Sequence, residues 1–295
     1  MTVQPTVSVI IPHYRDFRRL DICLASIAAQ TYPADRIQVI VGDNASPEGV
    51  ERVREAAAGR AEVVLVEARG AGPARNGAVA KATGEVLAFI DSDCVAEPQW
   101  VEEGVRALDA FDFVGGQVKV LVDDEAQMTP VEAWERVFAF DCRSYVERKG
   151  FAVTANLFCP RRLFETVGGF RVGISEDTEW CFRAQAQGFR LGYAERASVG
   201  HPARRDWDEL TRKWRRLNEE SYGLSAGRSA RRLRWALRAL AMPLSAVVHT
   251  PKVLGSPGLH TFGQRLAALR VLYAIRFWRL ADSFRVLRAD AGGPG

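Results

Sequence analysis

Two aspartates one residue apart follow a buried hydrophobic stretch in the N-terminal half of the chain. Val86 to Ile90 is a continuous apolar run between turn-forming residues, the pattern of a strand covered on both faces of a parallel sheet. The run ends in Asp91-Ser92-Asp93, and open α/β sheets bind their ligands at the carboxyl ends of such strands. Carboxylates at this spacing suit Mg²⁺ or Mn²⁺ that carries the phosphates of a ligand. The alternative is a turn in which one aspartate caps the next helix.

Polar residues also follow two earlier predicted strands. Val7 to Ile11 is followed by Pro12, His13 and Tyr14, and residues 38–41 are followed by Gly42 and Asp43. An acidic side chain such as Asp43 can accept the ring N–H of a uracil, on which Tyr14 can stack. Arg75, in a later segment, can pair with a phosphate or a base. The alternative for Asp43 is turn formation in Asp-Asn-Ala-Ser.

The elements that must position these residues alternate between strand and helix. A helix with apolar residues at Leu20, Cys23, Leu24 and Ile27 separates the first two strands, and a small-residue helix over 72–82 follows a third strand at 62–67. This alternation predicts a doubly wound, mostly parallel sheet. Neither the dinucleotide fingerprint GxGxxG after the first strand nor a phosphate-binding GxxxxGK[ST] loop is present.

The second half begins with a predicted strand at 113–120, and residues 121–150 are the least patterned part of the chain. Aromatic residues there could stack on a sugar or line a lipid groove, although at helical spacing such residues more often belong to a core. A helix is predicted after Ser175, with Trp180, Phe182, Ala184 and Phe189 packed inward.

The composition is that of an ordinary soluble protein. Of the 295 residues, 47% are hydrophobic and 26% charged. The five cysteines form no metal-type spacing and indicate reduced thiols, and the sequence shows neither a secretory signal nor an uncharged apolar run long enough to span a membrane. Residues 201–295 contain 18 lysines and arginines against 7 acidic residues, whereas the first two hundred contain 22 against 29. A basic C-terminal region beside a mildly acidic one favours an anionic partner surface.

The ordered set of motifs resembles family 2 glycosyltransferases. The resemblance extends from about residue 7 to residue 201 and rests on residues 7–14, 42–46, 74–78, 84–93, 154–156, 161–164, 167–170 and 175–177. Each segment alone is weak, but their order and spacing are specific. The resemblance implies a GT-A fold with a Rossmann-like sheet, an inverting reaction, a nucleotide-sugar donor and a divalent metal, Mg²⁺ or Mn²⁺.

The resemblance also implies roles for the donor-side residues. Asp43 and Arg75 would hold the nucleobase, usually uracil, and Asp91 the ribose, while Asp93 would coordinate the metal beside the diphosphate. Pro12, His13, Tyr14 and Ser92 complete the expected nucleotide site, and Asp91 and His201 are further candidate metal ligands. For His201, an ordinary polar role is equally compatible with the sequence. Cys94 stands where many relatives have another acidic residue, and we expect its thiol to be buried and packed in the core rather than to bind a metal.

Glu176-Asp177 resembles the family's acidic pair, in which the aspartate is the base. An inverting transfer needs a carboxylate to take the proton of the attacking acceptor hydroxyl. We expect Asp177 to do this, with Glu176 positioning it or the acceptor and Glu179 as a distant second candidate. The alternative is that both carboxylates cap a helix, which does not exclude catalysis.

The basic region after residue 203 predicts two amphipathic helical segments, 230–248 and 264–287, rich in arginine, leucine and tryptophan. They suit an anionic membrane interface, and a helical cap or an oligomer contact is the alternative. We therefore expect a catalytic domain over 1–203, with halves 1–95 and 96–203, and a helical region over 204–295. The predicted enzyme is cytoplasmic and peripheral on the inner membrane, prefers a UDP-sugar, and acts on a glycan or lipid-linked acceptor.

Two other classes remain open at this level. The first is a non-catalytic nucleotide-binding scaffold of the same fold, against which the complete set of aspartates argues. The second is a sugar nucleotidyltransferase, which would need a Gly-rich basic loop after the first strand, where this chain has Pro12-His-Tyr-Arg-Asp16. We expect no nucleic-acid partner, since no reading motif accompanies the basic region.

Overall fold

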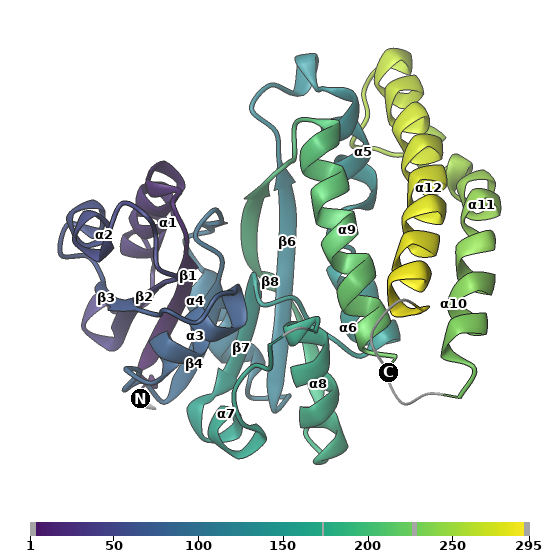
Figure 1. Ribbon diagram of the computed structural model, residues 1–295. Helices are drawn as coiled ribbons and strands as arrows, with labels where there is room; N and C mark the ends of the chain where they lie inside the picture. The colour runs from purple at the N-terminus through teal and green to yellow at the C-terminus, as the bar shows by residue number, and fades with distance from the viewer. Residues whose placement is uncertain (1–3, 173, 226–228, 292–295) are drawn as a thin grey trace. The chain divides into compact units, whose positions relative to one another are not determined.

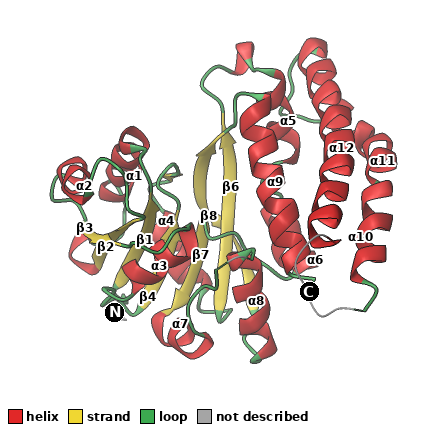
Figure 2. Ribbon diagram, viewed as in Figure 1, coloured by secondary structure: helices red, strands yellow, loops and turns green. Residues whose placement is uncertain are grey.

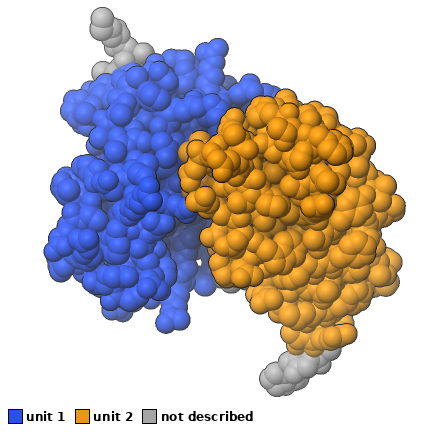
Figure 3. Space-filling view, turned by 90° about the horizontal axis from the view of Figure 1, so that it is seen from above, with its two compact units in different colours: residues 1–119, 140–172, 176–201 blue, residues 120–139, 173–175, 202–295 orange. Residues whose placement is uncertain are grey.

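The computed structural model describes residues 4–172, 174–225 and 229–291 (Figure 1). The chain divides into two compact units, coloured separately in Figure 3. Unit 1 comprises residues 1–119, 140–172 and 176–201, and unit 2 comprises residues 120–139, 173–175 and 202–295. The domain limits expected from the sequence, residues 1–203 and 204–295, stay predictions.

Unit 1 is built on an eight-stranded mixed sheet in the order β3-β2-β1-β4-β7-β6-β8-β5. Strands β1 to β4 pair in parallel, whereas β7 is antiparallel to both β4 and β6, and β5 is antiparallel to β8. The strands are β1 Val7–His13, β2 Ile37–Asp43, β3 Glu62–Leu65, β4 Val86–Ile90, β5 Val95–Ala96, β6 Phe113–Leu121, β7 Asn156–Pro160 and β8 Leu191–Pro202. The last residues of β6 and β8 belong to unit 2.

Helices cover both faces of this sheet (Figure 2). Alternate residues of each central strand enter different apolar clusters: Val9 and Ala88 belong to one, and Ile10 and Leu87 to the other. Because both faces are buried, Val86 to Ile90 is apolar at every position. The helices of unit 1 are α1 Phe17–Ala28, the 3-10 turn η1 Ala34–Arg36, α2 Val50–Ala57, α3 Ala71–Val79, α4 Trp100–Ala107, α6 Cys142–Lys149, α7 Arg161–Val167 and α8 Glu176–Ala186.

Unit 2 is almost entirely helical. Its elements are the 3-10 turn η2 Glu125–Gln127, α5 Pro130–Phe138, α9 Trp207–Gly223, α10 Arg231–Leu240, α11 Met242–Leu254 and α12 Phe262–Ala291. Trp134 of α5 packs in one apolar cluster with Leu210 of α9, Ala246 of α11 and Leu272 of α12. The segment 121–150 therefore supplies α5 to the core of unit 2, in which the aromatic Trp134 is buried. Within the described residues, no helix combines the length and the apolar character needed to cross a bilayer.

Candidate active site

The ends of β1 and β2 hold a buried carboxylate. Their register places His13 opposite Asp43, and the His13 Nδ1 atom lies 3.3 Å from Asp43 Oδ1. The Ser46 hydroxyl donates to Asp43 Oδ1 at 2.6 Å, and the Ser46 backbone N–H donates to Oδ2 at 3.2 Å. Asp43 is thus fixed in orientation, while Tyr14 in the following loop is 54% exposed and able to meet a ligand.

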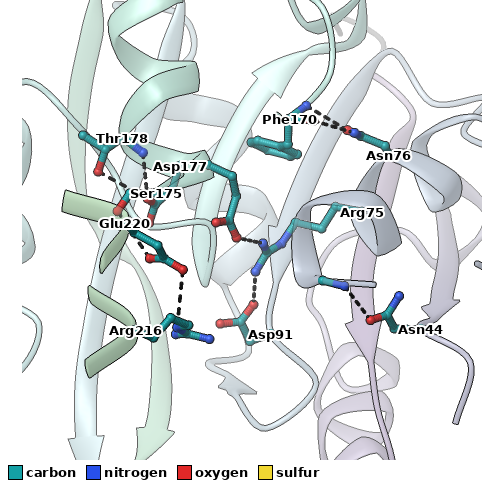
Figure 4. A network of polar contacts seen from close by, with 12 residues as sticks. Asn44, Arg75, Asn76, Asp91, Phe170, Ser175, Asp177, Thr178, Arg216 and Glu220 are labelled. Carbon is teal, nitrogen blue, oxygen red and sulfur yellow. Dashed lines mark hydrogen bonds and ion pairs between the residues drawn. The ribbon is translucent and has the colours of Figure 1, made fainter. Parts of the chain in front are cut away.

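A close backbone approach brings α3 to this edge of the sheet. A Cβ atom on Gly42 would lie 2.2 Å from the Ala74 carbonyl oxygen, so only glycine permits this packing. On the other side of α3, the Asn76 amide donates to the Phe170 carbonyl oxygen at 2.8 Å and accepts the Phe170 N–H at 2.9 Å (Figure 4). Arg75, between these two anchors, is consequently held in one place.

Arg75 joins carboxylates from two distant parts of the sequence. Its Nη2 atom donates to Asp91 Oδ1 at 2.6 Å, at the end of β4 (Figure 4). Its Nη1 atom donates to Glu176 Oε1 at 2.9 Å, at the start of α8. Arg75 is only 3% exposed. Burial lowers the pKa of the Arg75 guanidinium, but Asp91 and Glu176 more than offset this effect and raise it overall. The guanidinium therefore stays charged and links the two acidic segments.

The second aspartate of the DSD segment faces a histidine. Two residues after Asp93 the chain forms β5, in which Val95 pairs with Gly200 of β8. This pairing places the neighbouring His201 with its Nε2 atom 3.5 Å from Asp93 Oδ2. Ser92 lies half-buried between the two aspartates, and Cys94 is buried, as expected. Among the described residues, no cluster of three or more histidine, cysteine or acidic side chains has the arrangement of a protein-only metal site.

Asp177 lies one residue beyond Glu176 on α8. Its Oδ1 atom accepts the Thr178 backbone N–H at 2.6 Å and the Thr178 hydroxyl at 3.3 Å (Figure 4). Desolvation, together with the negative charge of Glu176, raises the pKa of Asp177 from 3.8 to about 6. A carboxylate with this pKa is ionised at neutral pH and has a higher proton affinity than an ordinary aspartate, which suits a general base. Glu179 is instead bound by Arg183 and Arg171, at 2.9 and 3.0 Å.

The predicted site residues therefore gather in three groups within unit 1. Pro12 and His13 end β1 beside Asp43; Arg75 binds Asp91 and Glu176; and Asp93 faces His201. The pairing of Arg75 with both acidic segments could not be predicted from the sequence, because its partners lie 16 and 101 residues away. The residue roles implied by the resemblance stay predictions.

Comparison with known proteins gives a consistent set of relatives. The model of the family "Glycosyl transferase family 2" matches residues 8–174. The glycosyltransferase AglE of Haloferax volcanii is 31% identical over 223 residues, which cover 73% of this chain and 72% of that protein.

Two solved structures share the fold. The mannosyltransferase PcManGT of Pyrobaculum calidifontis, in complex with GDP-Man and Mn²⁺, superposes with a TM-score of 0.64 at 20% identity over 97% of this chain and 88% of the other. S. aureus TarS 1–349, in complex with UDP-GlcNAc, superposes with a TM-score of 0.55 at 16% identity over 95% of this chain and 91% of the other. The predicted GT-A fold with C-terminal helices is confirmed.

Proposed function

The chain belongs to glycosyl transferase family 2 and is a glycosyltransferase, and we propose that it is an inverting, metal-assisted enzyme that takes its sugar from a nucleotide-diphosphate donor, preferentially a UDP-sugar. The observation that carries this proposal is the Asp91–Arg75–Glu176 bridge. It brings the donor-side acidic pair and the candidate base into one neighbourhood, as a transfer between two substrates requires.

On the donor side, Asp43 and Tyr14 bind the nucleobase, and Asp91 binds the ribose. Asp43 presents a pre-oriented acceptor, since His13 and Ser46 hold its carboxylate. Pro12 and Ser92 line the same strand ends. Arg75 remains a candidate for the nucleobase as well, although both of its terminal nitrogens are engaged by carboxylates. Nucleotide sugars in the similar structures, GDP-Man and UDP-GlcNAc, support this class of donor.

The donor set at Asp93 fits a divalent cation that is bound partly by substrate. Asp93 and His201 offer an oxygen and an imidazole nitrogen that already face each other at 3.5 Å, with Asp91 two residues away. Mg²⁺ and Mn²⁺ commonly use one or two protein ligands and complete their coordination with phosphate oxygens and water. When bound, the cation would offset the charge of the diphosphate. The Mn²⁺ in the PcManGT complex supports this assignment.

On the acceptor side, Asp177 takes the proton of the attacking hydroxyl as that oxygen approaches the anomeric carbon from the face opposite the diphosphate. Glu176 positions this base indirectly, because Arg75 fixes its carboxylate and its charge keeps the Asp177 pKa high. The acceptor we propose is a glycan or a lipid-linked sugar.

We also propose that the enzyme is cytoplasmic and that unit 2 rests on an anionic membrane surface. Residues 201–295 carry a net charge of about +11 at neutral pH. Leucines and valines of α10 and α11 are more than half exposed: Leu233, Leu237, Leu240, Leu244, Val247 and Val248. An apolar surface beside arginines is the composition of an interfacial helix. The packing of α11 and α12 into the core of unit 2 shows that these helices also have a structural role.

The test is calorimetric titration of the full chain with UDP and GDP, with Mn²⁺ and then with EDTA. We expect tight binding of one nucleotide that requires the metal and is lost in Asp93→Ala. Asp109→Ala, which removes an exposed aspartate after α4, is the matched control and should bind normally. Binding of GDP but not UDP would overturn the proposed donor, and binding that survives EDTA would overturn the metal.

A further inference from the structure

Three arginines of unit 2 gather between α10 and α12. Arg276 and Arg279 lie one turn apart on α12, which packs against α9 and α10 (Figure 1). Burial and the charges of Arg276 and Arg238 lower the pKa of Arg279 to about 9. Burial and Arg238 likewise lower the pKa of Arg276. Arg279 is therefore repelled by both Arg276 and Arg238, and Arg276 is repelled by Arg238.

Among the described residues, none forms an ion pair with an arginine of this cluster, although the charge of Asp282 partly opposes the lowering of the Arg279 pKa. Arg279 is 6% exposed, and the buried Nε atoms of both Arg276 and Arg279 have no hydrogen-bond partner among the described residues. Asp282 forms its close contacts with other residues: Arg285 Nε lies 2.6 Å from its Oδ1 atom and Asn218 Nδ2 lies 2.9 Å from its Oδ2 atom. In the described part of the chain, no ion pair includes any of the three arginines. Buried charges are costly unless they are paired, so the cluster is incomplete as it stands.

An aromatic ring holds the most buried of the three in a defined plane. The Arg279 guanidinium lies 3.6 Å from the centre of the Trp214 ring on α9, and Arg238 lies 5.4 Å from that of Trp235 on α10. A stacked guanidinium keeps its N–H groups in the plane of the fork, where they can bind two oxygens of one anion. The arrangement is therefore suited to a tetrahedral oxyanion.

We propose that Arg238, Arg276 and Arg279 form a phosphate-binding site, distinct from the transferase site of unit 1. A phosphate would supply the missing negative charge and accept the unpaired N–H groups. The neighbouring side chains favour the phosphate of a lipid over free phosphate, because Leu237 and Phe277 lie next to these arginines in sequence and are 58% and 54% exposed. A lipid would place its headgroup among the arginines and its chains against these apolar residues.

The experiment compares the full chain with Arg276→Gln and Arg238→Gln in two assays. The first is co-sedimentation with vesicles of phosphatidylcholine alone or in an equimolar mixture with phosphatidic acid. The second is the melting temperature in inorganic phosphate against chloride at equal ionic strength. The matched control is Arg270→Gln, an exposed arginine on α12 half a turn away from Arg279 on the helical wheel.

We expect binding to phosphatidic acid vesicles that falls about tenfold or more in either cluster variant, since each loses a charge-assisted contact. The control should lose no more than the few-fold expected for any surface arginine near a membrane. Arg276→Gln should melt no lower than the wild type without ligand, because it relieves repulsion; a structural role alone would lower its melting temperature. Should Arg276→Gln fail to fold, the exposed Arg238→Gln carries the test.

The two sources of phosphate give different results. Lipid dependence without an effect of inorganic phosphate identifies a lipid headgroup, while a phosphate-dependent rise in melting temperature, lost in the cluster variants, identifies free phosphate. Equal losses in all three variants, or no response to either probe, would overturn the site. Nucleotide binding should be unchanged in every variant, so failure here is separable from failure of the proposed transferase function.

Discussion

Replacing Asp177 by asparagine should stabilise the protein while removing its activity. The folded state raises the pKa of Asp177 from 3.8 to about 6, through desolvation first and the Glu176 charge second. Between these two pH values the folded state binds a proton that the unfolded state has released. The free energy of unfolding therefore falls as the pH rises from about 4 to 6. Above that range, the destabilisation caused by the ionised Asp177 stays constant.

The size of the effect follows from the shift. About two pKa units correspond to a cost of about 3 kcal/mol at neutral pH, at 1.36 kcal/mol per unit. Asparagine carries no charge and keeps an oxygen for the Thr178 N–H. Asp177→Asn should thus be more stable than the wild type by up to about 3 kcal/mol at pH 8, and the difference should disappear near pH 4. Turnover should fall by about 10²–10⁴, because the acceptor hydroxyl loses its base.

Urea denaturation followed by circular dichroism at pH 8 and pH 4 measures the first effect, and release of nucleoside diphosphate from the donor measures the second. Asp208→Asn is the matched control: it makes the same change at an exposed position in the first turn of α9 and should cost only a few tenths of a kcal/mol. If Asp177 is a helix cap and nothing more, its variant will retain turnover, and instead of gaining stability at pH 8 it will lose the few tenths of a kcal/mol by which a charged cap exceeds asparagine. That result would refute both the electrostatic reasoning and the assignment of the base.

Two further substitutions test the groups around this base. Glu176→Gln removes the second cause of the raised Asp177 pKa, so the acid limb of the pH profile of kcat/KM should move below pH 6. The control Glu179→Gln should leave this limb in place. An unmoved limb in Glu176→Gln would contradict the assignment of Asp177 as the base. Arg75→Met leaves Asp91 and Glu176 without their shared partner and should lower the free energy of unfolding, measured by urea denaturation, by about 3–5 kcal/mol. Arg75→Lys should have a stability between those of the wild type and Arg75→Met. A loss below about 1 kcal/mol in Arg75→Met would show that the bridge is not a buried ion pair in solution.

Local patterns in the sequence predicted the central part of the fold. The strand at Val86–Ile90 has the predicted bounds, because a run buried on both faces is apolar at each position and ends where the polar site begins. The meeting of His13 with Asp43 follows from parallel strands ending at one edge. Strand ends in a parallel sheet are thus a reliable guide to which polar residues meet.

Two parts of the chain were predicted less well. Phe182 was expected inside but is 44% exposed, because α8 buries Trp180 and Ala184, and a residue two positions after Trp180 lies on the opposite face of a helix. The helix α5 lay in the segment considered unpatterned. The start of this helix could have been predicted from the sequence, because Thr129 and Glu132 form a capping box with proline at the first helical position.

The Asp91–Arg75–Glu176 bridge could not be predicted from the sequence for a different reason. A pairing with Glu176, 101 residues away, depends on the antiparallel half of the sheet, which no local period specifies. Motif resemblance could assign these residues individually, but only the tertiary packing shows that one guanidinium serves two carboxylates.

This shared partner accounts for the difference between the two neighbouring acids of α8. Both terminal nitrogens of Arg75 are used, one by Asp91 and one by Glu176, and the charge of Arg75 lowers the pKa of Asp177 less than desolvation and Glu176 raise it. Glu176 is held ionised next to it and repels a second negative charge. Asp177 therefore keeps a high proton affinity while its neighbour supplies the fixed charge. The bridge places the donor-side aspartate and also leaves the adjacent carboxylate poised to accept a proton near neutral pH.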